Sequence, residues 1–352
     1  MSPNASAARL LVPILIMLLA GCGDARQETE PTRIQGQTFG TFYQVSVADD
    51  LDSEQRSALR GRLENELAQV DRQMSTYRDD SDLNRLNEAD VGEWVTLPDP
   101  VIQLLSRARM ISEATDGAFD ITVGGLVNLW SFGPEARPRE KPSDRVLEQR
   151  LEQVGFRQVA VDQEAGRARR LSDIYVDLSA IAKGYAVDRL DILLEDAGYE
   201  AYLVNIGGDL LAQGRKRSGE PWRIGIELPR DGEQVARHAL PLLNMSLATS
   251  GDYRNYFEAD GKRYSHTIDP RDGRPVQHRL ASASVFHPEN TMADALATAF
   301  MVMGTDQALA HAREADIAVL LIERQEGGFR TRLSPALRDI LAEKDIERLL
   351  ND

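Results

Sequence analysis

The chain has 352 residues, of which 42% are hydrophobic and 28% charged, and its formal net charge at pH 7 is −15. This composition is typical of a globular protein with one large domain or two closely packed lobes. The negative charge argues against nucleic acid or an anionic membrane face as a partner. With five scattered histidines and a single cysteine, Cys22, a zinc site of the usual kind is not expected.

The N-terminal segment predicts export and lipid attachment. Residues 10–20 form an apolar run that is shorter than the roughly 20 residues needed to span a membrane. The run ends in Leu19-Ala20-Gly21-Cys22, a pattern similar to the cleavage site of bacterial lipoproteins, and Cys22 is the only cysteine of the chain. We therefore expect residues 1–21 to be a signal peptide and Cys22 to carry lipid. The alternative is an ordinary signal peptide with a chance cysteine.

Lipid attachment would also determine where the protein is located. Full acylation of Cys22 supplies more than one buried chain, which is what stable anchoring to a bilayer requires. We expect the protein on the periplasmic side of the bacterial inner membrane, and the outer membrane stays open as the alternative. Residues 22–33 are polar and predict a lipidated, flexible tether, and residues 34–350 predict the folded domain.

The spacing of apolar residues predicts helices and strands in the first part of the domain. Residues 37–47 alternate between apolar and polar as a strand does. Asp52 with Gln55 is typical of the capping box that begins a helix. A second helix is expected to begin at Asp99-Pro100 and to end before Gly117.

The second part of the domain continues the alternation. We expect a strand over residues 175–178, followed by a helix that stops at Gly198. Further elements are expected as buried strands over residues 201–206, 222–228 and 317–322, and as a helix over 294–303 that ends at Gly304. Strands joined both by hairpins and by helices favour an α+β or mixed α/β fold over a pure doubly wound sheet.

Asp294 and Thr298 are candidate metal ligands. They lie four residues apart on a predicted helix, so both side-chain oxygens project from one face. Carboxylate and hydroxyl oxygens suit a hard cation, magnesium or calcium. The structural alternative is that Asp294 caps the helix and Thr298 hydrogen-bonds back to a carbonyl.

Two glycine-containing blocks are candidates for binding a phosphate. In residues 177–184, small residues allow a ligand to approach the backbone, and Lys183 can offer a positive charge. The alternative is a solvated lysine at a helix start. Residues 205–209, Asn-Ile-Gly-Gly-Asp, lack the spacing of a dinucleotide fingerprint or a P-loop, so the glycines of a tight turn are the simpler interpretation.

Two aromatic residues and one histidine are further candidates. Tyr77 and Phe119 each follow a predicted helix, where a ring can stack on an isoalloxazine or adenine, although burial in the core is the commoner role. His266 precedes a predicted turn over residues 269–273 and can transfer a proton. The alternative is a surface histidine hydrogen-bonded to that turn.

Taken together, these blocks resemble the FAD:protein FMN transferases, also called ApbE-like flavin transferases. The matching blocks follow the family's order and cover nearly the whole mature chain, at residues 36–41, 74–77, 117–122, 127–130, 177–184, 205–209, 248–253, 265–270 and 294–298. The chain departs from the family pattern at Phe39, Gly125 and Asn205. The resemblance implies a T-fold-like α+β architecture of mixed sheets and helices, with two intimately packed lobes and the ligand cleft between them.

The resemblance also implies an activity and a site. The activity is a magnesium-dependent transfer of the FMN half of FAD to a threonine of an acceptor protein, with release of AMP. Magnesium is expected at the backbone oxygen of Ala180 and the side chains of Asp294 and Thr298. Either His266 or the metal-linked Asp294 would take the proton of the threonine. FAD is expected to contact Phe39, Tyr77, Ala118, Phe119, Asp120, Lys183, His266 and Ile268.

The expected partner is a flavoprotein subunit. Acceptors of the family carry a motif resembling Asp-x-x-Ser/Thr-Gly-Ala-Thr, in sodium-pumping or electron-transfer complexes. Two other functions stay open: a magnesium-dependent FAD pyrophosphatase that yields FMN and AMP, and a non-catalytic periplasmic lipoprotein that binds FAD. Covalent flavin on an acceptor would distinguish the transferase, and the intact candidate metal ligands weigh against storage alone.

Overall fold

The structure is a computed structural model that describes residues 30–351, apart from 134–139, 230–235, 254 and 260. The predicted signal peptide, Cys22 and most of the predicted tether lie outside the described residues. Within the described part of the chain, no helix is both long and apolar enough to cross a membrane.

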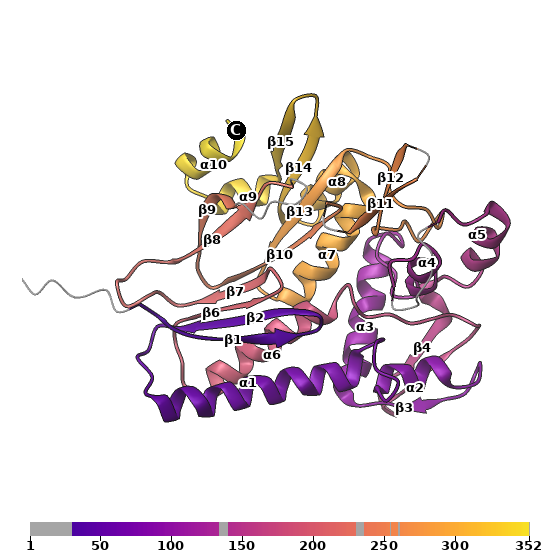
Figure 1. Cartoon of the computed structure of the whole chain (residues 1–352), viewed down its shortest axis with the longest axis horizontal. Coiled ribbons are helices and arrows are strands. Elements are labelled where there is room, and N and C mark those ends of the chain that lie inside the picture. The colour runs from indigo at the N-terminus through magenta and orange to yellow at the C-terminus, as the bar shows by residue number, and fades with distance from the viewer. Residues whose placement is uncertain (1–29, 134–139, 230–235, 254, 260, 352) are drawn as a thin grey trace, which may run out of the picture.

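An eight-stranded antiparallel sheet forms the centre of the fold (Figure 1), in the order β1-β2-β6-β7-β10-β13-β14-β15. Its strands are β1 (Thr32–Thr38), β2 (Thr41–Val47), β6 (Tyr202–Ile206), β7 (Asp209–Gln213), β10 (Met245–Gly251), β13 (Leu280–His287), β14 (Ala318–Gln325) and β15 (Gly328–Leu333). Because β2 pairs with β6, and β7 with β10, segments far apart in the sequence lie side by side.

Three smaller sheets surround the central one. They are β3 (Val95–Thr96) with β5 (Arg167–Arg170) and β4 (Val159–Asp162), β8 (Trp222–Glu227) with β9 (Ala236–Leu242), and β11 (Tyr256–Ala259) with β12 (Lys262–Ser265). The helices are α1 (Ser53–Met74), α2 (Asp82–Glu88), α3 (Asp99–Ala114), α4 (Gly124–Leu129), α5 (Asp144–Leu151), α6 (Ala182–Asp196), α7 (Asn290–Met303), α8 (Thr305–Glu314), α9 (Pro335–Ile340) and α10 (Glu343–Leu350). The predicted α+β class is confirmed, whereas the division into two lobes stays a prediction.

Local sequence signals explain the helix ends. In the capping box before α1, Asp52 Oδ1 accepts a hydrogen bond from the Gln55 backbone N–H at 2.8 Å. Gln55 Oε1 accepts one from the Asp52 N–H at 3.0 Å. The helix α3 begins at Asp99, as expected, and α6 ends before Gly198, whose φ of 83° favours glycine.

Three expected elements differ from the structure. Residues 37–47 form a hairpin rather than one strand, because Phe39 and Gly40 have φ of 49° and 70° and make a two-residue turn. Residues 175–178 make only an isolated bridge between Tyr175 and Val123, since the backbone of Val176 bonds to the side chain of Asn87. The helix α7 begins at Asn290, ahead of the expected start at Asp294.

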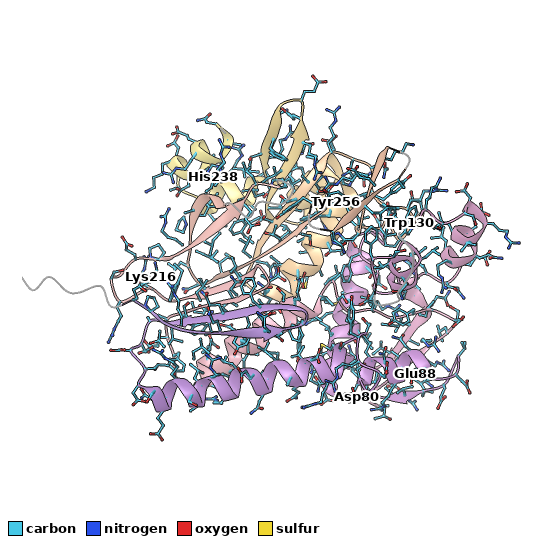
Figure 2. The ribbon with its side chains drawn as sticks, in the orientation of Figure 1. Asp80, Glu88, Trp130, Lys216, His238 and Tyr256 are labelled. Carbon is cyan, nitrogen blue, oxygen red and sulfur yellow. The ribbon has the colours of Figure 1, made fainter. Side chains whose placement is uncertain are left out.

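The main core contains buried apolar residues of the helices α1, α3 and α6 and of the strands β1, β2 and β6. A separate cluster of aliphatic and aromatic residues surrounds Trp130, which is labelled in Figure 2. The Trp130 ring stacks on Tyr264 with 5.4 Å between ring centroids, and its Nε1–H donates to the Gly273 carbonyl at 2.8 Å. This cluster connects the 127–130 block to the turn that follows His266, and so joins two of the blocks on which the family resemblance depends.

Candidate functional site

The helix α7 carries two of the candidate metal ligands, Asp294 and Thr298, and packs closely against α6; the third, Ala180, lies just before the start of α6. Gly184 lies at the contact: a Cβ atom there would lie 2.4 Å from the Asn290 carbonyl oxygen and 2.8 Å from the Asp294 Cβ. No side chain fits at that distance, so the glycine permits the approach of the two helices. The close approach brings the 177–184 block to the 294–298 block.

Asp294 points across this contact toward the start of α6. It is the fifth residue of α7 and only 3% exposed, so the interpretation as a helix cap is wrong. Its Oδ2 accepts a hydrogen bond from the Gly184 backbone N–H at 3.0 Å. The N-terminus of a helix carries a partial positive charge, which stabilises a carboxylate placed there.

Lys183 lies between two buried carboxylates. Its Nζ is 2.5 Å from Asp209 Oδ2 and 3.3 Å from Asp294 Oδ1, and its side chain is 34% exposed. Lys183 is therefore an ion-paired lysine at the helix start, and the interpretation as a freely solvated one is wrong. Burial raises the pKa of Asp209 to about 6, against the attraction of the Lys183 ammonium.

Asp209 is a site residue that the sequence analysis did not assign. It opens β7, directly after Gly207 and Gly208, whose φ of 59° and 105° make a tight two-residue turn between β6 and β7. The tight-turn interpretation of these glycines is confirmed. The sequence did contain a signal for Asp209, because it is an acidic residue between the turn glycines and an apolar strand. A carboxylate buried at the start of such a strand needs a hydrogen-bonding or charged partner.

Thr298 and Ala180 complete the candidate metal ligands. Thr298 Oγ1 lies 3.2 Å from Ser250 Oγ, which brings the 248–253 block on β10 beside α7. The amides of Ile181 and Ala182 both bond to the Leu178 carbonyl. Because Gly184 N–H bonds to Asp294, the Ala180 carbonyl accepts no backbone N–H in the part of the chain that the structure describes.

These donors fit a hard cation by their chemistry. They offer a buried carboxylate, a hydroxyl and a carbonyl oxygen to which no backbone N–H of the described residues donates, all of which are oxygen ligands that magnesium accepts. Among residues 30–351, with the gaps given above, no group of three or more His, Cys, Asp or Glu side chains is placed to hold a metal. A cation here would depend on this mixed set, on water and on substrate phosphates.

The 117–122 block lies next to the 177–184 block, because the Asp177 N–H donates to the Ile121 carbonyl at 2.7 Å. Asp120 stabilises this loop, because its carboxylate accepts hydrogen bonds from the Thr122 N–H at 2.7 Å, the Thr122 Oγ1–H at 2.6 Å and the Phe156 N–H at 2.8 Å. Burial raises the pKa of Asp120. Thr122 in turn accepts from the Gly155 N–H, so the loop is fixed by buried hydrogen bonds.

The candidate flavin contacts differ in exposure. Ala118 and Phe119 are each 1% exposed, so the Phe119 ring is part of the core rather than a free surface for stacking. Any ligand contact at these two residues would use the backbone. Tyr77 is 70% exposed, which contradicts a core role. Partial desolvation, and then the charge of Asp177, raise the pKa of Tyr77. Phe39 is half-buried in the β1–β2 turn.

His266 is half-buried and bonded to Asn255 rather than to the turn at 269–273, so the surface interpretation is wrong. Its Nδ1 lies 3.1 Å from the Asn255 carbonyl oxygen, and its ring meets the Phe132 ring edge-on. Since a carbonyl only accepts hydrogen bonds, Nδ1 carries the proton and Nε2 is the basic nitrogen. Burial lowers the pKa of His266, which favours the neutral ring. Ile268 is 4% exposed.

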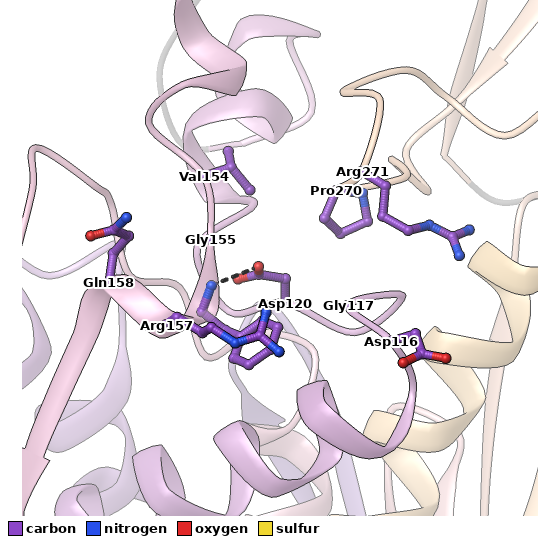
Figure 3. A pocket seen from close by; sticks show the side chains of 10 residues that line it. Asp116, Gly117, Asp120, Val154, Gly155, Arg157, Gln158, Pro270 and Arg271 are labelled. Carbon is purple, nitrogen blue, oxygen red and sulfur yellow. Dashed lines mark hydrogen bonds between the residues drawn. The ribbon is translucent and has the colours of Figure 1, made fainter.

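A pocket of about 320 Å³ lies beside the Asp120 loop (Figure 3). It joins that loop to the turn after His266, since both contribute to its wall. The lining residues are Asp116, Gly117, Asp120, Val154, Gly155, Phe156, Arg157, Gln158, Pro270 and Arg271. The guanidinium groups do not leave it strongly basic, because Arg271 pairs with Asp269 and the carboxylates of Asp116 and Asp120 also line the pocket.

Comparison with known proteins identifies relatives along nearly the whole chain. Residues 39–321 match the ApbE family. The chain is 39% identical to a protein named FAD:protein FMN transferase from Haemophilus influenzae over 342 residues, which is 96% of this chain and 98% of that protein. It is 36% identical to the protein of the same name from Escherichia coli K12 over 345 residues, with the same two coverages.

Solved structures agree with the sequence relatives. The apo form of the flavinyl transferase ApbE from Pseudomonas stutzeri has a TM-score of 0.82 and 39% identity, and the match covers 89% of this chain and 97% of that one. The flavin transferase ApbE from Vibrio cholerae has a TM-score of 0.81 and 38% identity, over 89% of this chain and 99% of that one. The family match and these identities show that the chain belongs to the ApbE family.

Proposed function

We propose that this protein is an FAD:protein FMN transferase, which moves the FMN half of FAD to a threonine of an acceptor protein and releases AMP. The observation that carries the proposal is the meeting of Lys183, Asp209 and Asp294 where α6 and α7 touch. Relatives that bear this name over 96% of the chain support it.

The proposed magnesium site consists of the Ala180 carbonyl, the Asp294 carboxylate and the Thr298 hydroxyl. Bound there, magnesium would neutralise charge on the pyrophosphate of FAD. Lys183 directs a second positive charge to the same phosphates. The Lys183 side chain is 34% exposed, and so accessible to a ligand, and its ammonium is paired with Asp209. Positioning and charge neutralisation are the main requirements of phosphoryl transfer.

We assign to His266 the proton of the attacking threonine. The Asn255 carbonyl fixes the ring with Nε2 as the basic nitrogen, and the lowered pKa keeps the ring neutral at pH 7. The Asp294 carboxylate is the alternative base, but its hydrogen bond to Gly184 and its contact with Lys183 already occupy it.

The flavin is proposed to lie against the exposed Tyr77 ring and the Phe39 turn, with the backbone of residues 118–120 and the segment from His266 to Ile268 beside it. We further propose a lipid anchor at Cys22 on the periplasmic side of the inner membrane, and an acceptor subunit that carries the Asp-x-x-Ser/Thr-Gly-Ala-Thr-like motif. The lipoprotein pattern in the sequence supports the anchor.

The experiment combines the chain lacking residues 1–22 with FAD and a domain that carries the acceptor motif, with and without magnesium. In-gel flavin fluorescence on the acceptor that requires magnesium, and that disappears when the acceptor Thr is changed to Ala, is the expected result. Free FMN and AMP with a dark acceptor would identify a pyrophosphatase instead. Unchanged FAD would favour a storage protein.

Two variants test the proposed metal ligand directly. Asp294→Asn removes the carboxylate charge and is expected to lower magnesium-dependent flavin transfer by about a hundredfold or more. Asp306→Asn, at an exposed acidic residue in the first turn of α8, is the matched control and should transfer flavin as the unmodified protein does. Equal activity of the two variants would contradict the assignment of Asp294.

A further inference from the structure

The Lys183 ammonium lies against the same carboxylate that the proposed function assigns to magnesium. Its Nζ is 3.3 and 3.5 Å from the two oxygens of Asp294 and 2.5 Å from Asp209 Oδ2. Asp209 and Asp294 are 2% and 3% exposed, so water hydrates neither carboxylate to any large extent. The lysine thus lies closer to Asp209 than to Asp294. Of these two carboxylates, only Asp294 is a proposed metal ligand.

The charges in this cluster are not balanced. One ammonium and two carboxylates leave one net negative charge in a buried place, which attracts a further cation. A divalent cation bound to Asp294 would repel an ammonium on the same carboxylate, because like charges at such distances oppose each other strongly in a protein interior. A metal on Asp294 would therefore weaken the hold of that carboxylate on the lysine, and Asp209 is the closer partner that remains.

A purely structural role explains the cluster poorly. Buried ion pairs contribute little net stability, since the desolvation of both groups offsets their attraction, and apolar replacements are often as stable. The backbone arrangement also favours a function: the Gly207–Gly208 turn places Asp209 at the start of β7, and Gly184 places Asp294 beside the first turn of α6. Lys183 on that turn is the one of these three side chains that water reaches, at 34% exposure.

We propose that Lys183 is a displaceable cation on Asp294 and that Asp209 is its positioning residue. A hard divalent cation takes Asp294 from the lysine, and Asp209 then retains the ammonium within the site, directed at the pyrophosphate of FAD. This inference rests on the proposed function, because it takes Asp294 as the metal ligand. It adds a competition between lysine and metal, and a role for Asp209.

The competition is tested by metal binding alone, without FAD and without an acceptor. The full chain, purified in detergent, is titrated with Mn²⁺ as a spectroscopic probe for a hard divalent cation, and free Mn²⁺ is measured by electron paramagnetic resonance. Lys183→Met is expected to bind Mn²⁺ about three- to tenfold more tightly, since the competing charge is gone. Lys262→Met removes an exposed lysine of β12 and should leave the affinity unchanged.

Asp209→Asn is expected to change the affinity in the opposite direction, because the lysine then has only Asp294 as a charged partner in this cluster. The double variant Lys183→Met with Asp209→Asn separates this from a general loss of negative charge. If Asp209 acts through Lys183, most of the weakening caused by Asp209→Asn disappears when Lys183 is absent. Equal weakening with and without Lys183 would overturn the positioning role of Asp209.

The double variant is also less prone to misfold than either single one, since it removes both charges of the closest pair, Lys183 and Asp209, and leaves neither buried without its counterion. Thermal unfolding of each variant shows whether it is folded. Unchanged or weaker Mn²⁺ binding by folded Lys183→Met, or by the double variant if the single one does not fold, would overturn the competition alone. Absence of Mn²⁺ binding by the unmodified chain would overturn the proposed metal site, and this inference with it. Flavin transfer is measured separately, so the two failures are distinguishable.

Discussion

Asp188 on α6 caps the N-terminus of α7, a helix to which it does not belong. Its Oδ1 accepts a hydrogen bond from the Asn290 N–H at 2.7 Å, and its Oδ2 accepts from the Thr291 N–H at 2.8 Å. The residue in the N-cap position of α7, Glu289, makes no side-chain cap. Asp188 therefore fixes the start of α7 about one turn before Asp294.

Replacement of Asp188 by Ala should destabilise the fold and disturb the candidate site together. Two buried amides and the Thr291 hydroxyl lose their acceptor, which we expect to lower the free energy of unfolding by about 1–3 kcal/mol. Urea denaturation measures the loss. Asp196→Ala, at an exposed position in the last turn of α6, is the control and should change stability by less than about 0.5 kcal/mol.

Two glycines in helices should respond to alanine with opposite signs. Gly61→Ala in α1 meets no atom within 4 Å and should raise the free energy of unfolding by about 0.5–1 kcal/mol, because alanine is the better helix former. Gly184→Ala would place a methyl group 2.4 Å from the Asn290 carbonyl oxygen. We expect it to force α6 and α7 apart, lower stability by about 1–3 kcal/mol and weaken metal binding.

The comparison of the two alanine variants is made by thermal or urea unfolding and by Mn²⁺ titration. If Gly184→Ala were as stable as Gly61→Ala and bound metal normally, the close contact of α6 with α7 would not matter for the site.

Asp120→Asn should destabilise the loop beside the pocket in Figure 3. One of the three donors that Asp120 now accepts, the Phe156 N–H, would face an amide NH₂ or lose its partner. We expect a loss of about 1–3 kcal/mol in the free energy of unfolding at pH 7. Asp116→Asn, an exposed position on the same loop, should be nearly neutral.

The effect of Asp120→Asn should also depend on pH. Burial raises the pKa of Asp120 above its ordinary 3.8, so the folded state holds the proton more tightly than the unfolded one. The extra stability that comes from protonation of Asp120 is complete below pH 3.8 and is lost as pH rises through the raised pKa, whereas the hydrogen bonds of Asp120 contribute at pH 7 as well. The difference in stability between the unmodified protein and Asp120→Asn should therefore shrink over that range, and a difference that grew with pH would contradict the assigned cause.

His266→Gln tests the proposed base through the pH profile of flavin transfer. A base must be unprotonated, and burial lowers the pKa of His266 below its ordinary 6.5. The rate of the unmodified protein should fall with acid only below pH 6.5, as the ring takes up a proton. His266→Gln should be slower by about 10²–10⁴-fold at pH 7 and should lack this acidic limb. An unchanged limb in the variant would assign the titration to another group.

Much of the fold could be predicted from local signals. The capping box of Asp52 with Gln55, and the glycine after α6 at Gly198, mark helix ends because they satisfy orphan backbone groups within a few residues. Extended segments were harder to predict, and residues 37–47 show why. The turn depends on Phe39 adopting a positive φ, which its side chain does not signal.

For the site, the residue types and the blocks in which they lie can be read from the sequence, since the resemblance to the family depends on those blocks alone. The contacts of each residue are visible only in the folded structure. Asp294 proved to reach α6 rather than to cap α7, and Lys183 proved to be held by Asp209. The physical reason is that these contacts join residues 26 to 111 positions apart, and local sequence preferences carry no information about which distant carboxylate a buried lysine will meet.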